Sequence, residues 1–274
     1  MTDSCPVCGG DRSRPAAGDA PFRRCRICCA VFNTAHAPLS YSDSYFTSDY
    51  KAQYGKTYEE DFAPIYRASK LRLERILKLR RGFTPEKPRS LLDIGCALGF
   101  FLKAAEDDGF SELKGIEISQ YASEYAKKRF GYEIEQKPFN ADALSGSFDA
   151  VTAWYFLEHL PDTKSAIDAI YAALAPDGVA AFSLPSYFGP LYMFRRSEWV
   201  NTHPADHRID LSPKSAVRAL RHAGFRRVRV YPSGIHPVRV MNSTSPLYPL
   251  FARAYALFSR ITGFSDTIEV YAMK

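Results

Sequence analysis

The stretch Leu91-Leu-Asp-Ile-Gly-Cys-Ala-Leu-Gly99 decides the fold, because a short apolar run passes here directly into a loop that contains glycine. Leu91–Ile94 predicts a buried strand, and Phe100–Asp107 predicts a helix after the loop. The loop begins at Gly95 and ends at Gly99. A strand, a tight loop and a helix in this order are typical of the first βα unit of an open α/β sheet, where the ligand of such a sheet usually lies.

The chain from Ser90 onward repeats this alternation of apolar strands and helical stretches. Further strands are expected at Leu113–Ile118, Tyr132–Gln136, Phe148–Trp154, Val179–Leu184 after a Pro-Asp-Gly turn at 176–178, Val228–Tyr231 and Thr267–Met273. Further helices are expected at Tyr121–Arg129, Thr163–Leu174 and Pro213–Ala223. The alternation predicts an α/β fold, a Rossmann-like doubly wound sheet of seven strands whose last strand is antiparallel.

Three zones of the chain differ in composition. Residues 1–40 hold five of the six cysteines and cannot bury a core alone, so we expect a small zinc-ribbon-like module. Residues 41–86 are rich in tyrosine and then become an amphipathic helix, which Pro85 and Pro88 end. We expect a helical cap or lid there, and the main domain over 87–274. The rings either line an acceptor pocket or pack the cap onto the main domain; they are Tyr41, Tyr45, Tyr50, Tyr54, Tyr58 and Tyr66.

Charge and hydropathy exclude some classes of protein. The net charge of +6 is too small to indicate a nucleic-acid binder unless the basic residues are concentrated. No apolar run approaches about 18 residues, so no transmembrane segment is expected. The N-terminus lacks the pattern of a signal peptide, and we therefore expect a cytoplasmic protein, in which paired cysteines indicate metal or redox chemistry.

The cysteine spacing predicts a metal site. Cys5-x2-Cys8 is followed after sixteen residues by Cys25-x2-Cys28, which is the spacing of tetrahedral zinc coordination by four thiolates. Four thiolates leave zinc no open position, so the expected role is structural. Buried or redox-active cysteines are the alternative. Cys29 is either a spare thiol or a competitor of Cys28.

The residues around the glycine loop distinguish between ligands. A dinucleotide fingerprint would place its third glycine where Phe100 stands, which argues against a nicotinamide dinucleotide. Asp93 would repel a pyrophosphate but can receive the ammonium group of an amino-acid ligand. Glu117 ends the second strand, where a carboxylate can accept hydrogen bonds from ribose hydroxyls. A glycine turn that binds nothing is the alternative.

The motifs along nearly the whole chain resemble those of class I S-adenosylmethionine-dependent methyltransferases, in the group with an N-terminal cysteine-rich module. They include Cys-Pro-Val-Cys-Gly, Tyr-Phe-x3-Tyr, Asp-Ile-Gly-Cys-Ala-x-Gly-Phe, Ser-Phe-Asp-Ala-Val, Leu-Glu-His-Leu-Pro-Asp at 157–162, Leu-Ala-Pro-Asp-Gly at 174–178 and His-x3-Leu-Ser-Pro from His207. The resemblance implies that Asp93, Gly95 and Gly99 surround the methionine part of the donor, that Glu117 holds the ribose and that residues near Phe139 cradle the adenine. The remaining expected donor contacts are Cys96, Ile118, Trp154 and Tyr155, although Cys96 is also a candidate for simple packing. The segment Lys137-Pro-Phe139-Asn140 lacks the acidic residue that many relatives offer to adenine.

The residues after Trp154 suggest a catalytic base. His159 can remove a proton from an acceptor, and Glu158 can orient it, although a Glu-His pair at a helix start also serves as a cap. His207 is a second candidate base. Some related O-methyltransferases bind a divalent ion through a Glu where Tyr155 stands, so no catalytic metal is expected.

The acceptor is the least determined part of the prediction. The family suggests a small molecule or carbohydrate, including a nucleotide- or glycan-linked sugar, methylated at oxygen or carbon. Several arginines are either a solvated surface or a phosphate site; they are Arg218, Arg221, Arg226, Arg227 and Arg229. The apolar stretch 247–264 predicts an amphipathic helix over the sheet or at an oligomer interface, with peripheral membrane contact less favoured. An RNA methyltransferase, disfavoured by the scarcity of stacking aromatics in the cysteine module, and a non-catalytic donor-binding scaffold are the alternatives.

Overall fold

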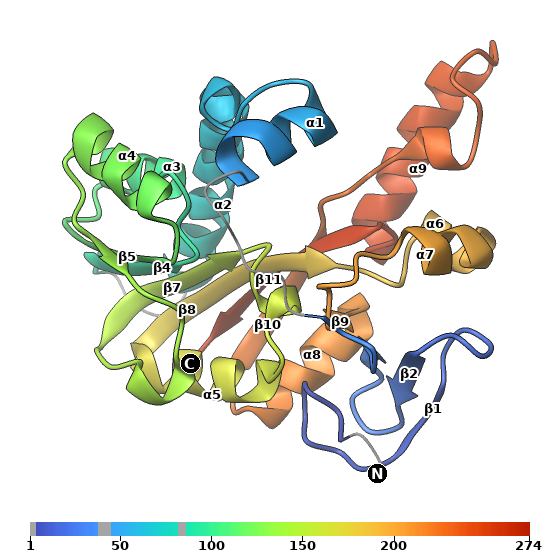
Figure 1. Ribbon diagram of the computed structural model, residues 1–274, viewed down its shortest axis with the longest axis horizontal. Coiled ribbons are helices and arrows are strands. Elements are labelled where there is room, and N and C mark those ends of the chain that lie inside the picture. Colours follow the sequence, from blue (N-terminus) through green and yellow to red (C-terminus); the bar gives the residue numbers. More distant parts are fainter. Residues whose placement is uncertain (1–3, 38–44, 82–85) are drawn as a thin grey trace. The chain divides into compact units, whose positions relative to one another are not determined.

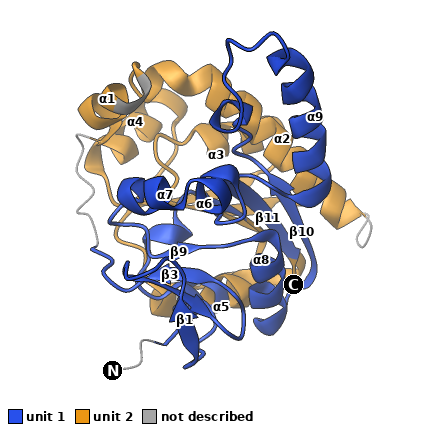
Figure 2. Ribbon diagram, turned by 90° about the vertical axis from the view of Figure 1, so that its right-hand side faces the viewer, with its two compact units in different colours: residues 1–38, 155–168, 182–272 blue, residues 39–154, 169–181, 273–274 orange. Residues whose placement is uncertain are grey.

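The computed structural model of the protein describes residues 4–37, 45–81 and 86–274. Tyr41, Pro85 and the boundary expected at residue 40 lie outside these ranges. The chain forms two compact units, shown in Figure 2. Unit 1 comprises Met1–Pro38, Tyr155–Asp168 and Phe182–Ala272, and unit 2 comprises Leu39–Trp154, Ala169–Ala181 and Met273–Lys274.

The main sheet has seven strands, as expected. They are β4 (Ser90–Ile94), β5 (Glu112–Glu117), β6 (Ile134–Gln136), β7 (Phe148–Trp154), β8 (Leu174–Pro185), β10 (Arg226–Pro232) and β11 (Thr267–Met273). Their order in the sheet is β10-β11-β8-β7-β4-β5-β6 (Figure 1). β4 pairs in parallel with β5 and with β7. This order places β4 between β5 and β7, so the glycine loop after β4 leaves the sheet at the point where the strand order reverses.

The last strand is antiparallel to its neighbour β8. Lys274 N–H donates to the carbonyl of Gly178, near the start of β8, and Ser186 N–H donates to Asp266 O, just before β11. These bonds join opposite ends of the two strands, which only an antiparallel pair allows. The expected Rossmann-like sheet, with helices around it, is therefore confirmed.

One expected turn is wrong. The Pro-Asp-Gly sequence at 176–178 lies inside β8, which begins at Leu174 and not at Val179. Asp177 adopts φ of +60°, so the sequence bends the strand without ending it. The bond from Lys274 to Gly178 continues the ladder through the bend.

The helices follow the expected order, with additions that no periodicity predicted. They are α1 (Tyr50–Tyr54), α2 (Phe62–Arg81), α3 (Phe100–Asp107), α4 (Gln120–Phe130), α5 (Thr163–Ala173), α6 (Pro190–Phe194), α7 (Arg196–Thr202), α8 (Pro213–His222) and α9 (Tyr248–Thr262). Short helical turns lie at η1 (Tyr45–Asp49), η2 (Glu59–Asp61), η3 (Ala141–Ala143), η4 (Leu157–His159) and η5 (Pro237–Arg239). No helix in the described ranges is both long and apolar enough to span a bilayer.

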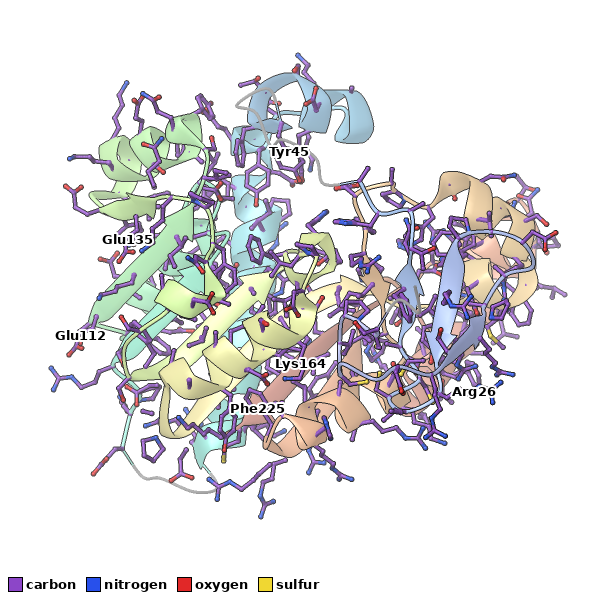
Figure 3. All side chains as sticks on the ribbon, turned by 60° about the horizontal axis from the view of Figure 1, so that its bottom comes forward. Arg26, Tyr45, Glu112, Glu135, Lys164 and Phe225 are labelled. Atoms are coloured by element: carbon purple, nitrogen blue, oxygen red, sulfur yellow. The ribbon has the colours of Figure 1, made fainter. Side chains whose placement is uncertain are left out.

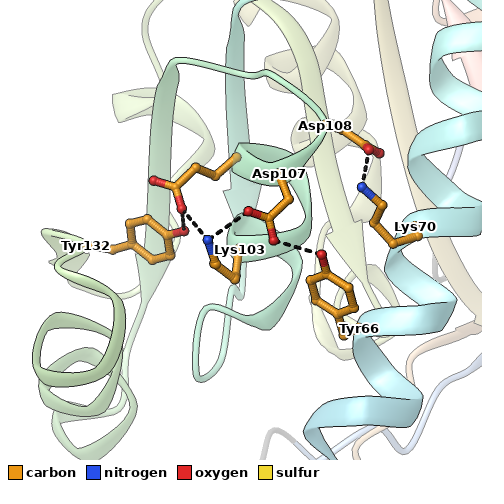
Figure 4. A network of polar contacts seen from close by, with 7 residues as sticks. Tyr66, Lys70, Lys103, Asp107, Asp108 and Tyr132 are labelled. Carbon is orange, nitrogen blue, oxygen red and sulfur yellow. Dashed lines mark hydrogen bonds and ion pairs between the residues drawn. The ribbon is translucent and has the colours of Figure 1, made fainter.

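In unit 2, polar contacts fix α2 against α3 (Figure 4). The Tyr66 hydroxyl donates to Asp107 over 2.7 Å, and Lys70 pairs with Asp108. Lys103 bridges Asp107 and Glu106 at 2.8 Å each. Glu106 and Asp107 are exposed and their partners are only half-buried, so each pair contributes little to stability.

The C-terminal end of α2 is held by a buried ion pair. Arg80 is 7% exposed, and its guanidinium lies 2.7 Å from the carboxylate of Asp149 at the start of β7. The other carboxylate oxygen of Asp149 accepts the amide hydrogens of Arg89 and Ser90, just before and at the start of β4. Asp149 therefore connects α2 to two strands of the sheet.

The tyrosine-rich segment of unit 2 packs by its rings. Tyr58 stacks on Phe100 with the ring centroids 5.6 Å apart, and Phe62 meets Phe100 edge-on at 4.9 Å. The Tyr50 hydroxyl donates to Asp61 over 2.7 Å. These contacts support packing of the segment onto the first residue of α3, directly after the glycine loop.

Unit 1 contains a second, four-stranded sheet. Its strands are β1 (Ser13–Pro15), β2 (Phe22–Cys25), β3 (Val31–Asn33) and β9 (Ile209–Asp210), in that order and antiparallel. Phe22 packs against Trp199 of α7 with the ring centroids 4.6 Å apart. The cysteine module is thus completed by a strand and a helix from the C-terminal half of the chain.

The amphipathic helix expected over 247–264 is present as α9. Tyr255 and Ser259 are buried, whereas Leu250 and Ile261 are 72% and 76% exposed. The helix therefore packs one face against the rest of unit 1 and exposes apolar side chains on another face.

Candidate functional site

The glycine loop of unit 2 is made of left-handed backbone. Gly95, Ala97 and Gly99 have φ of +68°, +47° and +78°. A Cβ on Gly99 would lie 3.3 Å from the Cβ of Ala126 in α4, so both its φ and its surroundings require glycine. The amides of Gly95 and Cys96 donate to the carbonyl of Ile116. The loop is therefore held tightly at the end of β5, with the start of α3 beside it.

Asp93 is a buried carboxylate at the carboxyl end of β4. It is 2% exposed, and the Thr152 hydroxyl of β7 donates to its Oδ1 over 2.6 Å. Burial raises its pKa to about 7, against the opposing effects of Thr152 and the Arg72 guanidinium. The group is thus near its ionisation midpoint at neutral pH, and a cationic ligand would favour the carboxylate form.

Glu117 braces the glycine loop. Its Oε2 accepts the amide hydrogen of Ala97 over 2.9 Å, and its Oε1 accepts those of Ile118 and Ser119 over 2.9 and 3.0 Å. Burial raises its pKa, and these three amides oppose the shift. A carboxylate has about four lone-pair sites, so three amide bonds leave acceptor capacity for a ligand hydroxyl.

The other residues expected to contact the donor differ in their exposure to solvent. Cys96 is 4% exposed, and its sulfur packs 2.7 Å from where a Gly115 Cβ would be, so its side chain has a packing role. Ile118 is 48% exposed and Phe139 is half-buried. Trp154 ends β7, with the Phe101 ring 5.2 Å away.

Arg72 is a residue of this site that sequence reasoning missed. Its guanidinium carbon lies 4.2 Å from the ring centroid of Trp154, and its charge lowers the pKa of Asp93. In the sequence it is one of many basic residues among the leucines of α2, and nothing local distinguishes it from its neighbours. Only the packing of α2 reveals it.

Unit 1 carries the expected acid and base residues in one cluster. Glu158 lies in η4, is 1% exposed, and has no hydrogen-bond partner for its Oε2 among the described residues. Burial raises its pKa to about 7. Its backbone carbonyl accepts the amide hydrogen of Arg208 over 2.6 Å, which fixes η4 beside the segment that carries His207.

His159 forms a pair with Asp206, which sequence reasoning did not single out. Its Nδ1 lies 2.8 Å from the carboxylate of Asp206. Burial alone would lower the pKa of His159, but the bond to Asp206 and the nearby Glu158 raise it above the usual value. His207 meets His159 edge-on at 4.8 Å, and burial together with the His159 charge lowers its pKa to about 4. The two candidate bases therefore differ sharply in basicity.

The same cluster has metal-binding capacity. One donor atom each from Glu158, His159 and His207 lies within 4.8 Å of the others. Tyr155 is not part of it: this residue is 44% exposed, has φ of +53° and donates its amide hydrogen to Ser183. The nearby His203 is engaged by Asp210 at 2.8 Å.

The four cysteines of the module lie together, with one sulfur from each within 4.8 Å of the others. Figure 3 shows sulfur atoms in yellow on the side of the molecule that carries Arg26. The sulfurs of Cys5 and Cys28 and those of Cys8 and Cys25 are 3.6 Å apart in each pair. A hydrogen bond with Cys28 lowers the pKa of the Cys5 thiol to about 6, so one thiolate already forms readily.

Cys29 is not part of the four-cysteine cluster. Its φ is +68°, the conformation for which a knuckle usually employs glycine. Its sulfur accepts from Arg218 over 2.9 Å, and its carbonyl accepts from the Tyr187 hydroxyl over 2.8 Å. Cys29 therefore contacts residues of the C-terminal half of unit 1.

Known proteins match much of this chain. A family described as "Methyltransferase domain" matches residues 66–230. The chain is 28% identical over 209 residues to the ubiquinone biosynthesis O-methyltransferase of Bordetella avium, covering 70% of this chain and 81% of that one. It is 30% identical over 193 residues to the protein of the same name from Ralstonia nicotianae, covering 66% and 75%.

Solved structures share the fold at low identity. A SAM-dependent methyltransferase from Archaeoglobus fulgidus superposes with a TM-score of 0.54 at 18% identity, over 85% of this chain and 100% of that one. The plantazolicin methyltransferase BamL, solved in complex with a triazolic desmethylPZN analog and SAH, gives 0.54 at 17% identity, over 84% and 93%. These two likenesses concern the fold alone.

Proposed function

Because the chain belongs to the methyltransferase family that it matches over residues 66–230 and is an S-adenosylmethionine-dependent enzyme, we propose that it methylates a hydroxyl group of a small molecule, with His159 as the base. S-adenosylmethionine supplies a methyl group that its sulfonium centre has already activated. The protein must then hold the donor, align the acceptor and take up the hydroxyl proton. The close approach of His159 Nδ1 to the carboxylate of Asp206, at 2.8 Å, is the observation that carries the choice of base.

We assign the donor to the glycine loop of unit 2. Asp93 is a buried carboxylate with a pKa of about 7. The ammonium group of a ligand would pair with it and favour its ionised form. Glu117 retains acceptor capacity for ribose hydroxyls. The left-handed backbone of Gly95 and Gly99 keeps side chains away from the loop and allows close approach of a ligand.

His159 is the better of the two candidate bases. Asp206 engages its Nδ1 and leaves Nε2 as the nitrogen that receives the proton, while the carboxylate stabilises the imidazolium that forms. The acceptor oxygen forms the new bond to carbon as the bond from carbon to sulfur breaks, and the hydroxyl proton passes to His159. His207, with a pKa of about 4, is a much weaker base.

The relatives support an oxygen acceptor on a small molecule, since those from Bordetella avium and Ralstonia nicotianae are named as O-methyltransferases. A carbohydrate hydroxyl belongs to the same chemical class and needs the same base. Nothing in the geometry favours the RNA alternative or the scaffold alternative over this function.

We also propose that the four cysteines hold a structural zinc ion. Tetrahedral coordination at about 2.3 Å places sulfurs roughly 3.8 Å apart, close to the 3.6 Å between the paired sulfurs. The metal would join the turn at Cys5 and Cys8, which precedes β1, to the turn at Cys25 and Cys28, which follows β2. Its charge would allow all four thiols to ionise.

The test is methyl transfer to a panel of phenols, catechols and sugars, with an RNA transcript as a further acceptor. His159→Gln should lower kcat by about 10²- to 10⁴-fold while leaving donor binding intact, because general base catalysis contributes that much. His222→Gln, an exposed histidine of α8, is the matched control. Full turnover by His159→Gln, or transfer to RNA alone, would contradict the proposal.

A further inference from the structure

Unit 1 contains a cavity of about 690 Å³ whose lining comes from both ends of the chain. The cysteine module contributes residues of β1 and β2, and the C-terminal half contributes residues around α6, α7 and the start of α8. The cationic and aromatic members of the lining are Arg14, Arg24, Tyr187, Phe188, Tyr192, Arg196 and Lys214. None of them belongs to the donor site or to the histidine cluster.

The charge of this cavity is unbalanced. Four cationic side chains line it, and none of its lining residues in the described ranges is acidic. Within the same ranges, no ion pair joins Arg14, Arg24 or Lys214 to a carboxylate. Like charges gathered in one cavity repel one another, and an anionic ligand would relieve that repulsion.

Two of the cations are held in place by aromatic rings. The guanidinium carbon of Arg196 lies 3.4 Å from the ring centroid of Tyr192, and this side chain also donates to the carbonyls of Ala16 and Tyr192 at 2.7 Å each. The guanidinium of Arg24 lies over Tyr187 at 5.3 Å. Both rings are buried, so they form a rigid floor under the charges. Groups positioned in this way lose little side-chain freedom when they bind.

The remaining two cations lie at the solvent side. Arg14 and Lys214 are exposed, and no hydrogen bond or ion pair holds either side chain among the described residues. Lys214 is in the first turn of α8, whose positive dipole end adds to the field. The cavity therefore has a cationic floor packed on buried rings and an exposed cationic rim, an arrangement that suits a ligand with more than one negative charge.

We propose that this cavity binds a small phosphorylated molecule through a diphosphate group. The guanidinium fork of Arg24 and Arg196 matches phosphate oxygens in geometry, and four cations match two phosphates better than a single carboxylate. A volume of about 690 Å³ exceeds what an inorganic ion fills and lies in the range for small organic ligands. This site is an addition to the proposed function and does not depend on it.

The test is calorimetric titration of the full-length protein with inorganic diphosphate and, separately, inorganic phosphate, in the presence of saturating S-adenosylhomocysteine. The donor product occupies the glycine loop and removes it as a competing site. We expect one diphosphate per chain, bound roughly tenfold or more tightly than phosphate. The variant Arg14→Gln/Lys214→Gln should weaken diphosphate binding by about tenfold or more. It should keep the fold, because both side chains are exposed.

The matched control is Arg221→Gln/Arg229→Gln. Both residues are exposed in unit 1 and lie outside the cavity, and their replacement removes the same total charge. This control should change the Kd by less than about twofold. If both variants weakened diphosphate binding equally, the loss would reflect only the lower net charge, and the proposal would be overturned. Wild-type affinity in Arg14→Gln/Lys214→Gln would overturn it as well. If a single-stranded RNA oligonucleotide bound more tightly than diphosphate, and Arg14→Gln/Lys214→Gln abolished that binding, the ligand would be a nucleic acid and the proposal would be overturned.

Discussion

Replacing Asp93 by Asn should stabilise the free protein and weaken donor binding at the same time. The carboxylate is buried, and its pKa rises from 3.8 to about 7 in the folded protein. The folded state therefore binds a proton that the unfolded state has released, so stability falls as the pH rises between these two values. Asn keeps the acceptor oxygen for Thr152 and removes the charge.

The magnitude follows from the shift of roughly three pKa units, each equivalent to about 1.4 kcal/mol. The buried charge then costs about 4 kcal/mol at pH 8 and about 2 kcal/mol at pH 5. Asp93→Asn should raise the free energy of unfolding by amounts of this order, and more at pH 8 than at pH 5. Loss of the carboxylate should weaken S-adenosylhomocysteine binding by about 10- to 100-fold, since a hydrogen bond to a charged group contributes about 1.5–3 kcal/mol.

The assays are urea unfolding at the two pH values and calorimetric titration with S-adenosylhomocysteine. Asp142→Asn is the control, because this carboxylate belongs to the same unit and is exposed. A destabilised Asp93→Asn variant at pH 8 would refute the assignment of a costly buried charge. Unchanged ligand affinity would refute its role in holding the donor.

Three further predictions concern the catalytic base, the metal site and the buried ion pair of Arg80. With His159 as base, kcat/KM should fall as the pH drops through its pKa, which is raised above 6.5; a profile that stays level to pH 5 would move the role to His207, whose pKa is about 4. Metal analysis should find one zinc ion per wild-type chain and none in Cys8→Ser, in which unit 1 should also no longer unfold cooperatively. An unchanged metal content in the variant would contradict the zinc site. Arg80→Met should destabilise the protein by about 3–5 kcal/mol in urea unfolding, because it leaves the carboxylate of Asp149 without its cation; a loss below about 1 kcal/mol would show that the backbone amides suffice.

Much of the fold could be predicted because it depends on local patterns. The strands Phe148–Trp154 and Thr267–Met273 and the helix Phe100–Asp107 have the bounds expected from apolar periodicity. The cysteine spacing also predicted which four side chains lie together. Each of these features is encoded within a short window of sequence.

The features that escaped prediction depend on contacts between distant segments. β9 has two residues, too few for any periodicity, and exists because Val31 and Phe32 pair with it. The Asp206 partner of His159 and the cationic cavity likewise arise from segments far apart in the chain. A residue type alone gives no signal for such an arrangement.

The most direct test of the account is a calorimetric titration of S-adenosylhomocysteine into the wild-type protein and into Glu117→Gln. The amide group of Gln would replace one oxygen that accepts backbone hydrogens from Ala97, Ile118 or Ser119 with a donor. We predict one molecule bound per wild-type chain and an affinity at least about tenfold lower in the variant. No binding by the wild-type protein, or equal affinity in the two, would contradict the claim that the glycine loop and Glu117 hold the methyl donor.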